Sequence, residues 1–374
     1  MILIMKIFVI NWRCIKNPLA GGAEIYFQEI FKRIVKMGHS VTQLGVKFDN
    51  APEDETVDGI KIIRIGTKNT FNFAVYRELP HLLEQDSYDI VIDDLNKIPF
   101  YSPWITKKPV LALMMHLFRR SIFSEVSIPF ASYVYLTESL IPWCYKKNNF
   151  AVLSPSTKQD VEKIGIKPDK IVVIPPGVDL SYFKPNYAIK EPYLIVHTGR
   201  LKKYKSVDHL LLATRQLSQK REDFKVVIVG DGDDLPRLKD IAKKLELENY
   251  VTFTGYISEQ EKLNYYQKAT VLVENSVKEG WGMIVIEANA CGTPVVAARS
   301  PGLRDAVLDQ KTGFLYDYGN IEDLTQKVEL LFDNKDLNRQ MAEAGIDWAK
   351  NFSWDNCTND MIKIIEKTVT EETK

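Results

Sequence analysis

Residues 276–296, SVKEGWGMIVIEANACGTPVV, contain an apolar segment that follows a Gly-Trp-Gly turn and leads into a second apolar run. The two glycines of this turn break regular structure, so a helix is predicted to begin between Trp281 and Met283. The run TPVVAA at 293–298 is typical of a buried strand. Together these segments predict a helix followed by a strand, the alternation from which parallel α/β sheets are built.

The same alternation extends away from this segment in both directions. Helical spacing of apolar residues predicts helices at 24–38, 207–220, 235–247 and 258–269. Short apolar runs predict strands at 6–11, 40–46, 61–66, 89–94, 109–115 and 150–156, and again at 193–200, 225–232, 250–257, 270–276 and 293–298. We therefore predict an α/β protein with Rossmann-like, doubly wound parallel sheets.

The length of the chain favours two domains, because 374 residues exceed the size at which a single core keeps growing. The paired prolines of IVVIPPGVD indicate a linker near 174–188. We expect an N-terminal domain over 1–178, a C-terminal domain over 189–352, and a helix over 353–374 that returns to the N-terminal domain. Ligands of such sheets bind at the carboxyl ends of the strands, so two facing domains would enclose a cleft.

The composition excludes several function classes. Lys plus Arg and Asp plus Glu both total 49, which gives no support for nucleic-acid binding. The four cysteines and the five histidines lack the spacing of a metal site, so we expect isolated buried thiols and no metal. The apolar N-terminus is too short to span a membrane, and a cytoplasmic location is expected.

Glu287 lies just over one turn inside the predicted apolar helix, where an unpartnered carboxylate would cost several kcal/mol. In one interpretation it pairs with a lysine or a backbone amide, and Glu279 only favours the positive end of the helix. In the other, Glu287 accepts hydrogen bonds from the vicinal hydroxyls of a ribose, and Glu279 faces the hydroxyls of a sugar. The N-terminus of the helix can bind a diphosphate in either case.

The segment KEGWGMIVIEANACGTPVV resembles the E-x7-E signature of the family 4 retaining glycosyltransferases, which have the GT-B fold. The segments PLAGGAE, MMH, HTGRLKKYKS, VIVGDGD and VTFTGYI are similar to other segments of that family in the same order, and the resemblance extends from Lys6 to about Val369. It implies metal-independent transfer of a hexose-type sugar from a UDP- or GDP-sugar, with retention of configuration, to a glycan, lipid-linked or small-molecule acceptor. A non-hydrolytic nucleotide-sugar epimerase and an inactive sugar-nucleotide-binding module remain alternatives.

The resemblance also implies roles for individual residues. Fixed cations stabilise the charge that gathers on a departing diphosphate, which is the role expected of Arg200 and Lys205. His116 is expected to donate a hydrogen bond to the donor sugar and Glu279 to position it, so the expected catalytic residues are His116, Arg200, Lys205 and Glu279. The expected substrate-binding residues are Gly21, Gly22, Tyr256, Ile257, Gly280, Trp281, Gly282, Met283, Ile284 and Glu287.

Several of these assignments have structural alternatives, in which Arg200 and Lys205 are solvated surface charges and His116 is a structural residue after an apolar strand. Gly21 and Gly22 either let the backbone approach phosphates or form a simple strand-to-helix turn. Tyr256 and Ile257 either line the pocket of the base or form a buried strand end. No cofactor is expected, because the nucleotide sugar is a co-substrate.

The chain departs from the family's pattern at three places. Ser206 stands where a glycine usually follows the lysine of the Gly-Arg-Leu segment. Pro301 and Asp305 replace a glycine and a glutamate in PGLRD, so the sugar contacts of the family are not carried over to residues 300–305. Trp281 replaces a smaller aromatic residue and would narrow the donor pocket.

Residues 117–150 combine many aromatic and aliphatic residues with Arg119, Arg120, Lys146 and Lys147. This composition suits a membrane interface, where apolar rings enter the bilayer and cations meet anionic lipid. Helices that cover the first sheet would have a similar composition. Both interpretations stay open, and peripheral contact with the cytoplasmic face of a membrane is one expectation, together with a lipid-linked acceptor.

Overall fold

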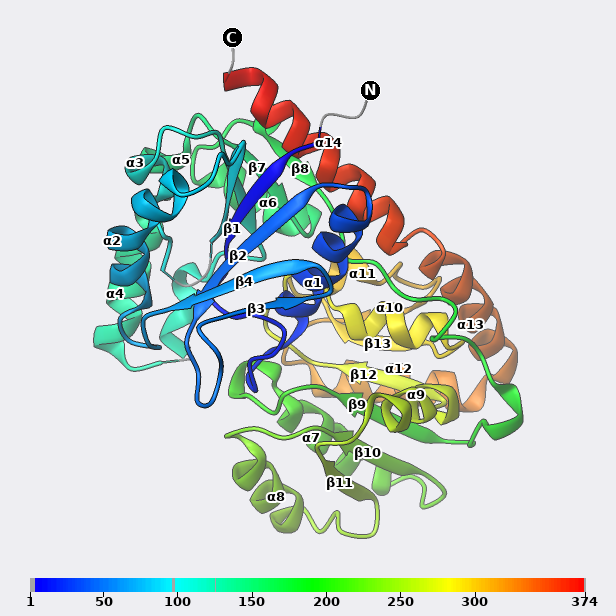
Figure 1. Cartoon of the computed structure of the whole chain (residues 1–374). Helices are drawn as coiled ribbons and strands as arrows, with labels where there is room; N and C mark the ends of the chain where they lie inside the picture. Colours follow the sequence, from blue (N-terminus) through cyan, green and yellow to red (C-terminus); the bar gives the residue numbers. More distant parts are fainter. Residues whose placement is uncertain (1–3, 96–97, 125, 373–374) are drawn as a thin grey trace. The chain divides into compact units, whose positions relative to one another are not determined.

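The computed structural model describes residues 4–95, 98–124 and 126–372. The chain forms two compact units, one of residues 1–177 with 354–374 and one of residues 178–353 (Figure 1). The chain passes from one unit to the other twice, after Gly177 and after Ser353. Both units are α/β structures built on largely parallel sheets, so the predicted fold class is confirmed.

The sheet of the first unit has eight strands in the order β3-β4-β2-β1-β5-β6-β7-β8. The six strands predicted from apolar runs in this half are all present. The bounds are β1 Lys6–Ile10, β2 Ser40–Val46, β3 Asp54–Val57, β4 Ile60–Ile65, β5 Ile90–Leu95, β6 Val110–Met114, β7 Asn149–Val152 and β8 Ile171–Val173. The predicted parallel pairing is confirmed for the strands that were expected, and the additional edge strand β3 pairs antiparallel with β4.

The helices of the first unit include one from the far end of the chain. Their bounds are α1 Gly22–Lys36, α2 Phe71–Glu84, α3 Ser102–Ile105, α4 Ile128–Ser139, α5 Ile141–Tyr145, α6 Pro155–Lys163 and α14 Trp354–Glu372. Helix α14 packs alongside α1, where Arg33 Nε lies 3.0 Å from Asp355 Oδ1 (Figure 1). It also contacts β7, since Asn149 Nδ2 donates to Thr368 Oγ1 at 3.0 Å. The final helix therefore completes the first unit.

The sheet of the second unit has six strands in the order β11-β10-β9-β12-β13-β14, with parallel pairing throughout. The five predicted strands are present, and β14 is an addition. The strands are β9 Leu194–Thr198, β10 Lys225–Val229, β11 Val251–Gly255, β12 Val271–Glu274, β13 Val295–Ala298 and β14 Gly313–Tyr316. The helices are α7 Val207–Ser218, α8 Leu235–Lys244, α9 Glu259–Lys268, α10 Met283–Ala290, α11 Leu303–Ala306, α12 Ile321–Asp333 and α13 Lys335–Ala349.

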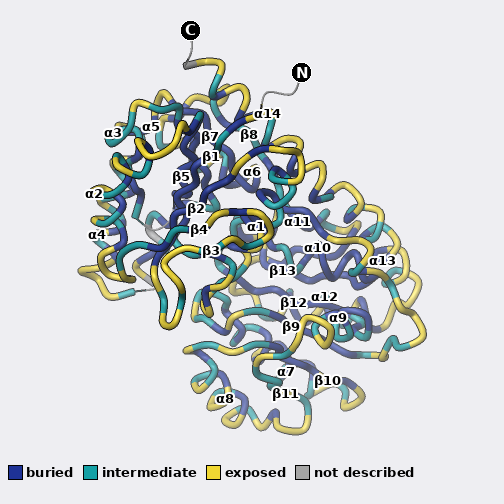
Figure 2. Tube along the Cα trace, in the orientation of Figure 1, coloured by how far each residue is buried: buried dark blue, intermediate teal, exposed yellow. Residues whose placement is uncertain are grey.

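The strand order of the second sheet decides which loops become neighbours. Strand β12 lies between β9 and β13, and the carboxyl ends of parallel strands meet at one edge. The loops 199–206, 275–282 and 299–302 therefore leave the sheet side by side. Figure 2 shows that the strands beneath them are buried, so these loops are supported by a packed core.

Candidate functional site

The loops after β9 and β12 bring Lys205 and Glu279 together. Lys205 Nζ lies 2.6 Å from Glu279 Oε1 and 3.8 Å from Glu274 Oε1. The Lys205 side chain is mostly buried and Glu274 is fully buried. Burial by itself would lower the pKa of Lys205, but Glu274 and Glu279 outweigh burial and raise this pKa well above its ordinary value. Lys205 is therefore a fixed cation held between two carboxylates.

Sequence reasoning missed Glu274, the last residue of β12. Ser276 donates a hydrogen bond to its Oε1, and His197 Nδ1 lies 4.0 Å from its Oε2. Burial lowers the pKa of His197 despite the nearby carboxylate, so the imidazole stays neutral and Lys205 is the cation beside Glu274. The signal was available, because Glu274 ends an apolar strand and Glu287 lies within an apolar helix.

Arg200 is the second expected cation, and it lies at the start of the same loop as Lys205. Its side chain is exposed and has no hydrogen bond or ion pair with any residue that the structure describes. The charge of Lys205 is matched by Glu279, whereas the charge of Arg200 is available to an anionic ligand.

Helix α10 begins at Met283, which confirms the predicted start. Its N-cap, Gly282, has φ +102°, and a Cβ at this position would lie 2.9 Å from Leu303 Cδ2, so the turn requires glycine. The backbone N–H groups of Met283 and Ile284 have no hydrogen-bond partner among the described residues. This end of α10 is thus equipped to receive an anion.

The PGLRD segment supports the loop that carries Glu279. Glu279 N donates to Pro301 O at 3.0 Å, and Ser300 Oγ donates to Ser276 O at 2.7 Å. Gly302 has φ +84°, and a Cβ there would lie only 2.3 Å from Glu279 O. The departure at Pro301 therefore falls on a residue whose carbonyl helps to hold the Glu279 loop in place.

Glu287 is buried and lies in the second turn of α10, with both of its contacts on one carboxylate oxygen. Tyr266 Oη donates to Oε2 at 3.0 Å, and Lys262 Nζ lies 3.3 Å from the same atom. Pairing with a lysine, one of the two interpretations, is confirmed. Oε1 has no hydrogen-bond partner within the described part of the chain, so this atom can accept from a ligand, and ribose binding stays a prediction.

Ser206 occupies a left-handed backbone conformation, with φ +50° and ψ +41°, at the N-cap of α7. This is where glycine costs least, which explains why the similar family has glycine here. Ser206 Oγ shares a hydrogen bond of 2.8 Å with Tyr318 Oη. The loop of Lys205 thus keeps its shape with a non-glycine residue.

The other predicted residues of the second unit lie around these loops. Tyr256 is 87% exposed, so its interpretation as a buried strand end is wrong, and Ile257 beside it is partly buried. Gly280 is partly buried within the Glu279 loop. Trp281 is buried and packs on Phe352, with ring centroids 5.1 Å apart, so its indole fills the protein interior of this unit.

Three predicted residues belong to the first unit. His116 follows β6 and lies against Phe118, with ring centroids 4.4 Å apart. Gly21 is the N-cap of α1, and its N–H donates to Glu24 Oε2 at 2.7 Å. Because the Gly21 amide already donates to Glu24, the structure supports the simple-turn interpretation for Gly21. Gly22 is the first residue of α1. The ligand contacts of all three stay predictions.

Within the described residues, no group of three His, Cys, Asp or Glu side chains is arranged to hold a metal ion. The four cysteines, Cys14, Cys144, Cys291 and Cys357, are buried and unbridged, as expected. Among the described helices, none combines the length and the apolar character that crossing a bilayer requires.

Solved structures identify the fold of this chain. Sucrose-phosphate synthase from Thermosynechococcus elongatus matches with a TM-score of 0.82 at 20% identity, over 98% of this chain and 100% of that one. HepE of Anabaena, solved with UDP and glucose, matches with a TM-score of 0.76 at 17% identity, over 97% and 100% of the two chains. The fold is the GT-B fold of glycosyltransferases.

Two family models match the sequence in succession. Residues 20–182 match Glycosyltransferase Family 4, and residues 181–348 match Glycosyl transferases group 1. The chain therefore belongs to the glycosyltransferases that combine a Glycosyltransferase Family 4 domain with a Glycosyl transferases group 1 domain.

Curated relatives agree with this assignment. A D-inositol 3-phosphate glycosyltransferase of Corynebacterium aurimucosum is 33% identical over 55% of this chain and 54% of its own length. An uncharacterized glycosyltransferase of Methanocaldococcus jannaschii is 24% identical over 96% of this chain and 97% of its own. The chain thus spans about half the length of several of the curated relatives that it matches.

Proposed function

We propose that this protein transfers a hexose-type sugar from a nucleoside diphosphate donor, a UDP- or GDP-sugar, to an acceptor with retention of anomeric configuration. The observation that carries the proposal is the group formed by Lys205, Glu279, Arg200 and the N-terminus of α10 at one edge of the second sheet. Supporting it, HepE of Anabaena, which has the same fold, was solved with UDP-glucose.

The proposed donor diphosphate binds at the start of α10. The amides of Met283 and Ile284 and the charge of Arg200 face the phosphates, whose negative charge grows as the glycosidic bond breaks. Because these groups are fixed before the reaction, they stabilise the transition state more than the ground state. The charge of Arg200 and the two helix amides then suffice for the leaving group, and no metal is required.

Lys205 and Glu279 act as a unit in this proposal. Glu279 accepts hydrogen bonds from hydroxyls of the donor sugar, while the ion pair with Lys205 holds the carboxylate in its orientation. Glu287 Oε1 accepts from the ribose hydroxyls. The acceptor hydroxyl attacks from the face of the leaving group, and a phosphate oxygen takes its proton, so no side chain is needed as a base.

A binding screen followed by a product assay tests the proposal. Thermal shift with UDP, GDP, ADP and CDP identifies the nucleotide, because a ligand that binds only the folded state raises the melting temperature. Mass spectrometry and NMR of the products then separate the alternatives. A new glycoside with retained configuration supports the proposal, an isomerised donor indicates an epimerase, and binding without turnover indicates a binding module.

Two further measurements test the roles of the site. Arg200→Ala should lower kcat by more than it weakens donor binding, and Lys203→Ala, an exposed lysine of the same loop, is the matched control. Equal losses in kcat and donor affinity for Arg200→Ala would contradict the leaving-group role. Loss of activity in EDTA would contradict metal independence.

A further inference from the structure

The solvent-exposed face of α4 is apolar, whereas the exposed face of a surface helix is usually polar. Its inward positions, Ala131, Val134 and Glu138, are buried, and the first two pack in a small cluster of their own, separate from the main core of the unit. The helix contains no lysine or arginine, and Glu138 is its one acidic residue. Figure 2 shows most of α4 as intermediate or exposed.

Large apolar side chains continue across this surface into α5. Ile128 is 71% exposed, Leu136 65% and Trp143 79%. Phe130, Tyr133 and Leu140 are exposed beside them. Large exposed apolar side chains on two helices in contact indicate an interaction site, because soluble proteins expose few such groups together. We call these six side chains the α4 face.

The sequence around the α4 face is strongly basic. Residues 98–159 contain seven lysines and arginines and two glutamates, an excess of five positive charges in a chain whose net charge is zero. One of the two glutamates, Glu138, is buried and accepts hydrogen bonds from the N–H groups of Phe118 and Arg119. It therefore does little to neutralise the surface.

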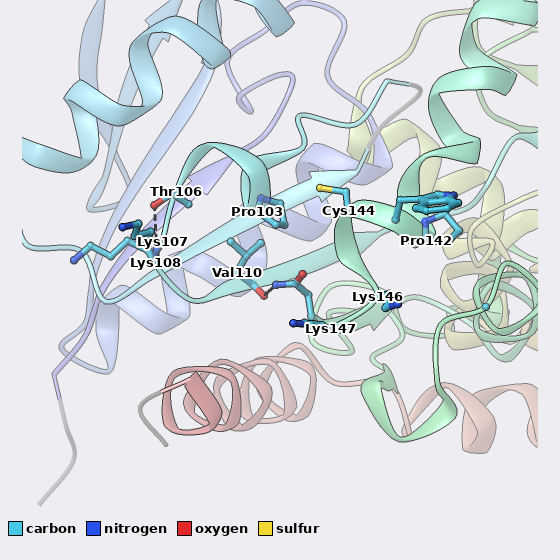
Figure 3. A pocket seen from close by; sticks show the side chains of 12 residues that line it. Pro103, Thr106, Lys107, Lys108, Val110, Pro142, Cys144, Lys146 and Lys147 are labelled. Atoms are coloured by element: carbon cyan, nitrogen blue, oxygen red, sulfur yellow. Dashed lines mark hydrogen bonds between the residues drawn. The ribbon is translucent and has the colours of Figure 1, made fainter.

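Four of these cations surround a cavity beside Trp143. The cavity, of about 550 Å³, is lined by Lys107 and Lys108 from the segment before β6, by Lys146 and Lys147 after α5, and by Trp143 (Figure 3). Within the described residues, none of the four lysines has an acidic partner. The cavity lies at the amino end of β6, and His116 follows the carboxyl end of that strand, so the cavity is separate from the predicted sugar site.

We propose that the α4 face and the lysine cavity dock this protein on an anionic phospholipid bilayer. The aliphatic and aromatic side chains enter the interface between headgroups and acyl chains, and the four lysines bind lipid phosphates around the cavity. The exposed apolar side chains suit the acyl-chain region of the bilayer, and the unpaired lysines suit its anionic headgroup region. This docking goes beyond the proposed transfer reaction and does not depend on it.

The charge of the surface argues against a second copy of the chain as the occupant. A symmetric dimer through the α4 face would place two sets of unpaired lysines near each other, and like charges oppose association. A nucleic acid would leave the aliphatic side chains of Ile128 and Leu136 without suitable contacts. An anionic bilayer offers apolar contacts to the α4 face and negative charges to the four lysines of the cavity.

Flotation with vesicles tests the docking directly. The full chain is expected to float with vesicles of phosphatidylglycerol and phosphatidylcholine at low salt, and to stay in the soluble fraction with phosphatidylcholine alone. Lys146→Gln/Lys147→Gln should lower the partition coefficient roughly 25-fold, at about fivefold per lysine. The matched control Lys243→Gln/Lys244→Gln, which changes two exposed lysines of α8, should leave binding unchanged.

Tryptophan emission provides a second, independent measurement. Vesicles should shift the emission of the wild type to the blue, and Trp143→Phe should lose most of this shift while keeping the melting temperature. Leu136→Ser should weaken flotation without changing nucleotide binding. Because nucleotide binding is measured separately by thermal shift, loss of docking and failure of the proposed transfer are distinguishable.

Four outcomes would overturn the proposal. They are the absence of flotation with anionic vesicles, equal losses in the Lys146/Lys147 and Lys243/Lys244 double variants, displacement of the protein by inorganic phosphate at constant ionic strength, and dimerisation that depends on Leu136 and Trp143. The third would indicate a site for free phosphate, and the fourth an interface between copies of the chain.

Discussion

Replacement of Lys205 by methionine removes the cation from a buried group of charges while keeping the length of the side chain. The Lys205 side chain is 12% exposed and Glu274 is 0% exposed, so the methionine variant leaves Glu274 without a cation in the interior. Breaking a buried ion pair on one side costs about 3–5 kcal/mol. Because Glu279 is 18% exposed and can regain some hydration, we expect a loss near the lower end, about 3 kcal/mol.

Native-state hydrogen exchange on peptides that cover 194–206 and 271–282 measures this loss within the second unit. Lys203→Met, on the same loop but exposed, should change the free energy of opening by less than about 0.5 kcal/mol. The double variant Lys205→Met/Glu274→Gln removes the stranded charge as well, so it should recover at least about 1 kcal/mol relative to Lys205→Met. A loss below about 1 kcal/mol for Lys205→Met would refute the claim that Lys205 and Glu274 form a buried charge group. Strictly additive effects of Lys205→Met and Glu274→Gln in the double variant would refute it as well.

Three further changes test other parts of the second unit. Glu287→Ala should weaken binding of the preferred nucleoside diphosphate at least about tenfold by titration calorimetry, and unchanged affinity would contradict the ribose contact. Gly282→Ala should lower the free energy of unfolding by about 1–3 kcal/mol in denaturant melts, because alanine is strained at this left-handed backbone position. Burial lowers the pKa of Lys190 to about 8, below its unfolded value, so the folded state binds fewer protons than the unfolded state between these two values. The free energy of unfolding should therefore rise by about 1 kcal/mol between pH 7 and 9. Lys190→Met should remove this rise.

The buried strands were predictable because each is a short apolar run in the sequence. Strand β3 was not, because its sequence DETV is polar and its pairing at the sheet edge depends on β4 rather than on its own side chains. Strand β14 has only four residues, GFLY, which are too few to show the alternation of apolar and polar residues that indicates a strand. Strand order was equally hidden, since local patterns carry no information on which distant strands pair.

The residue types of the site were predictable, but most of their partners were not. Lys262, which pairs with Glu287, lies on α9, and nothing in its local pattern distinguishes it from a solvated lysine. The same holds for Glu274 and Lys205, which are 69 residues apart in sequence. The contact between Gly21 and Glu24 could have been foreseen, because an acid three residues after an N-cap is the pattern of a capping box.

Helix α14 gives the first unit a discontinuous construction with consequences during synthesis. A ribosome produces all of residues 178–353 between the two parts of that unit, so the contact of Asp355 with Arg33 can form only after the second unit has emerged. Until then, the side of α1 that α14 covers is open to chaperones and proteases. Translation products that stop before Trp354 would keep this helix side uncovered, which makes them natural targets for degradation.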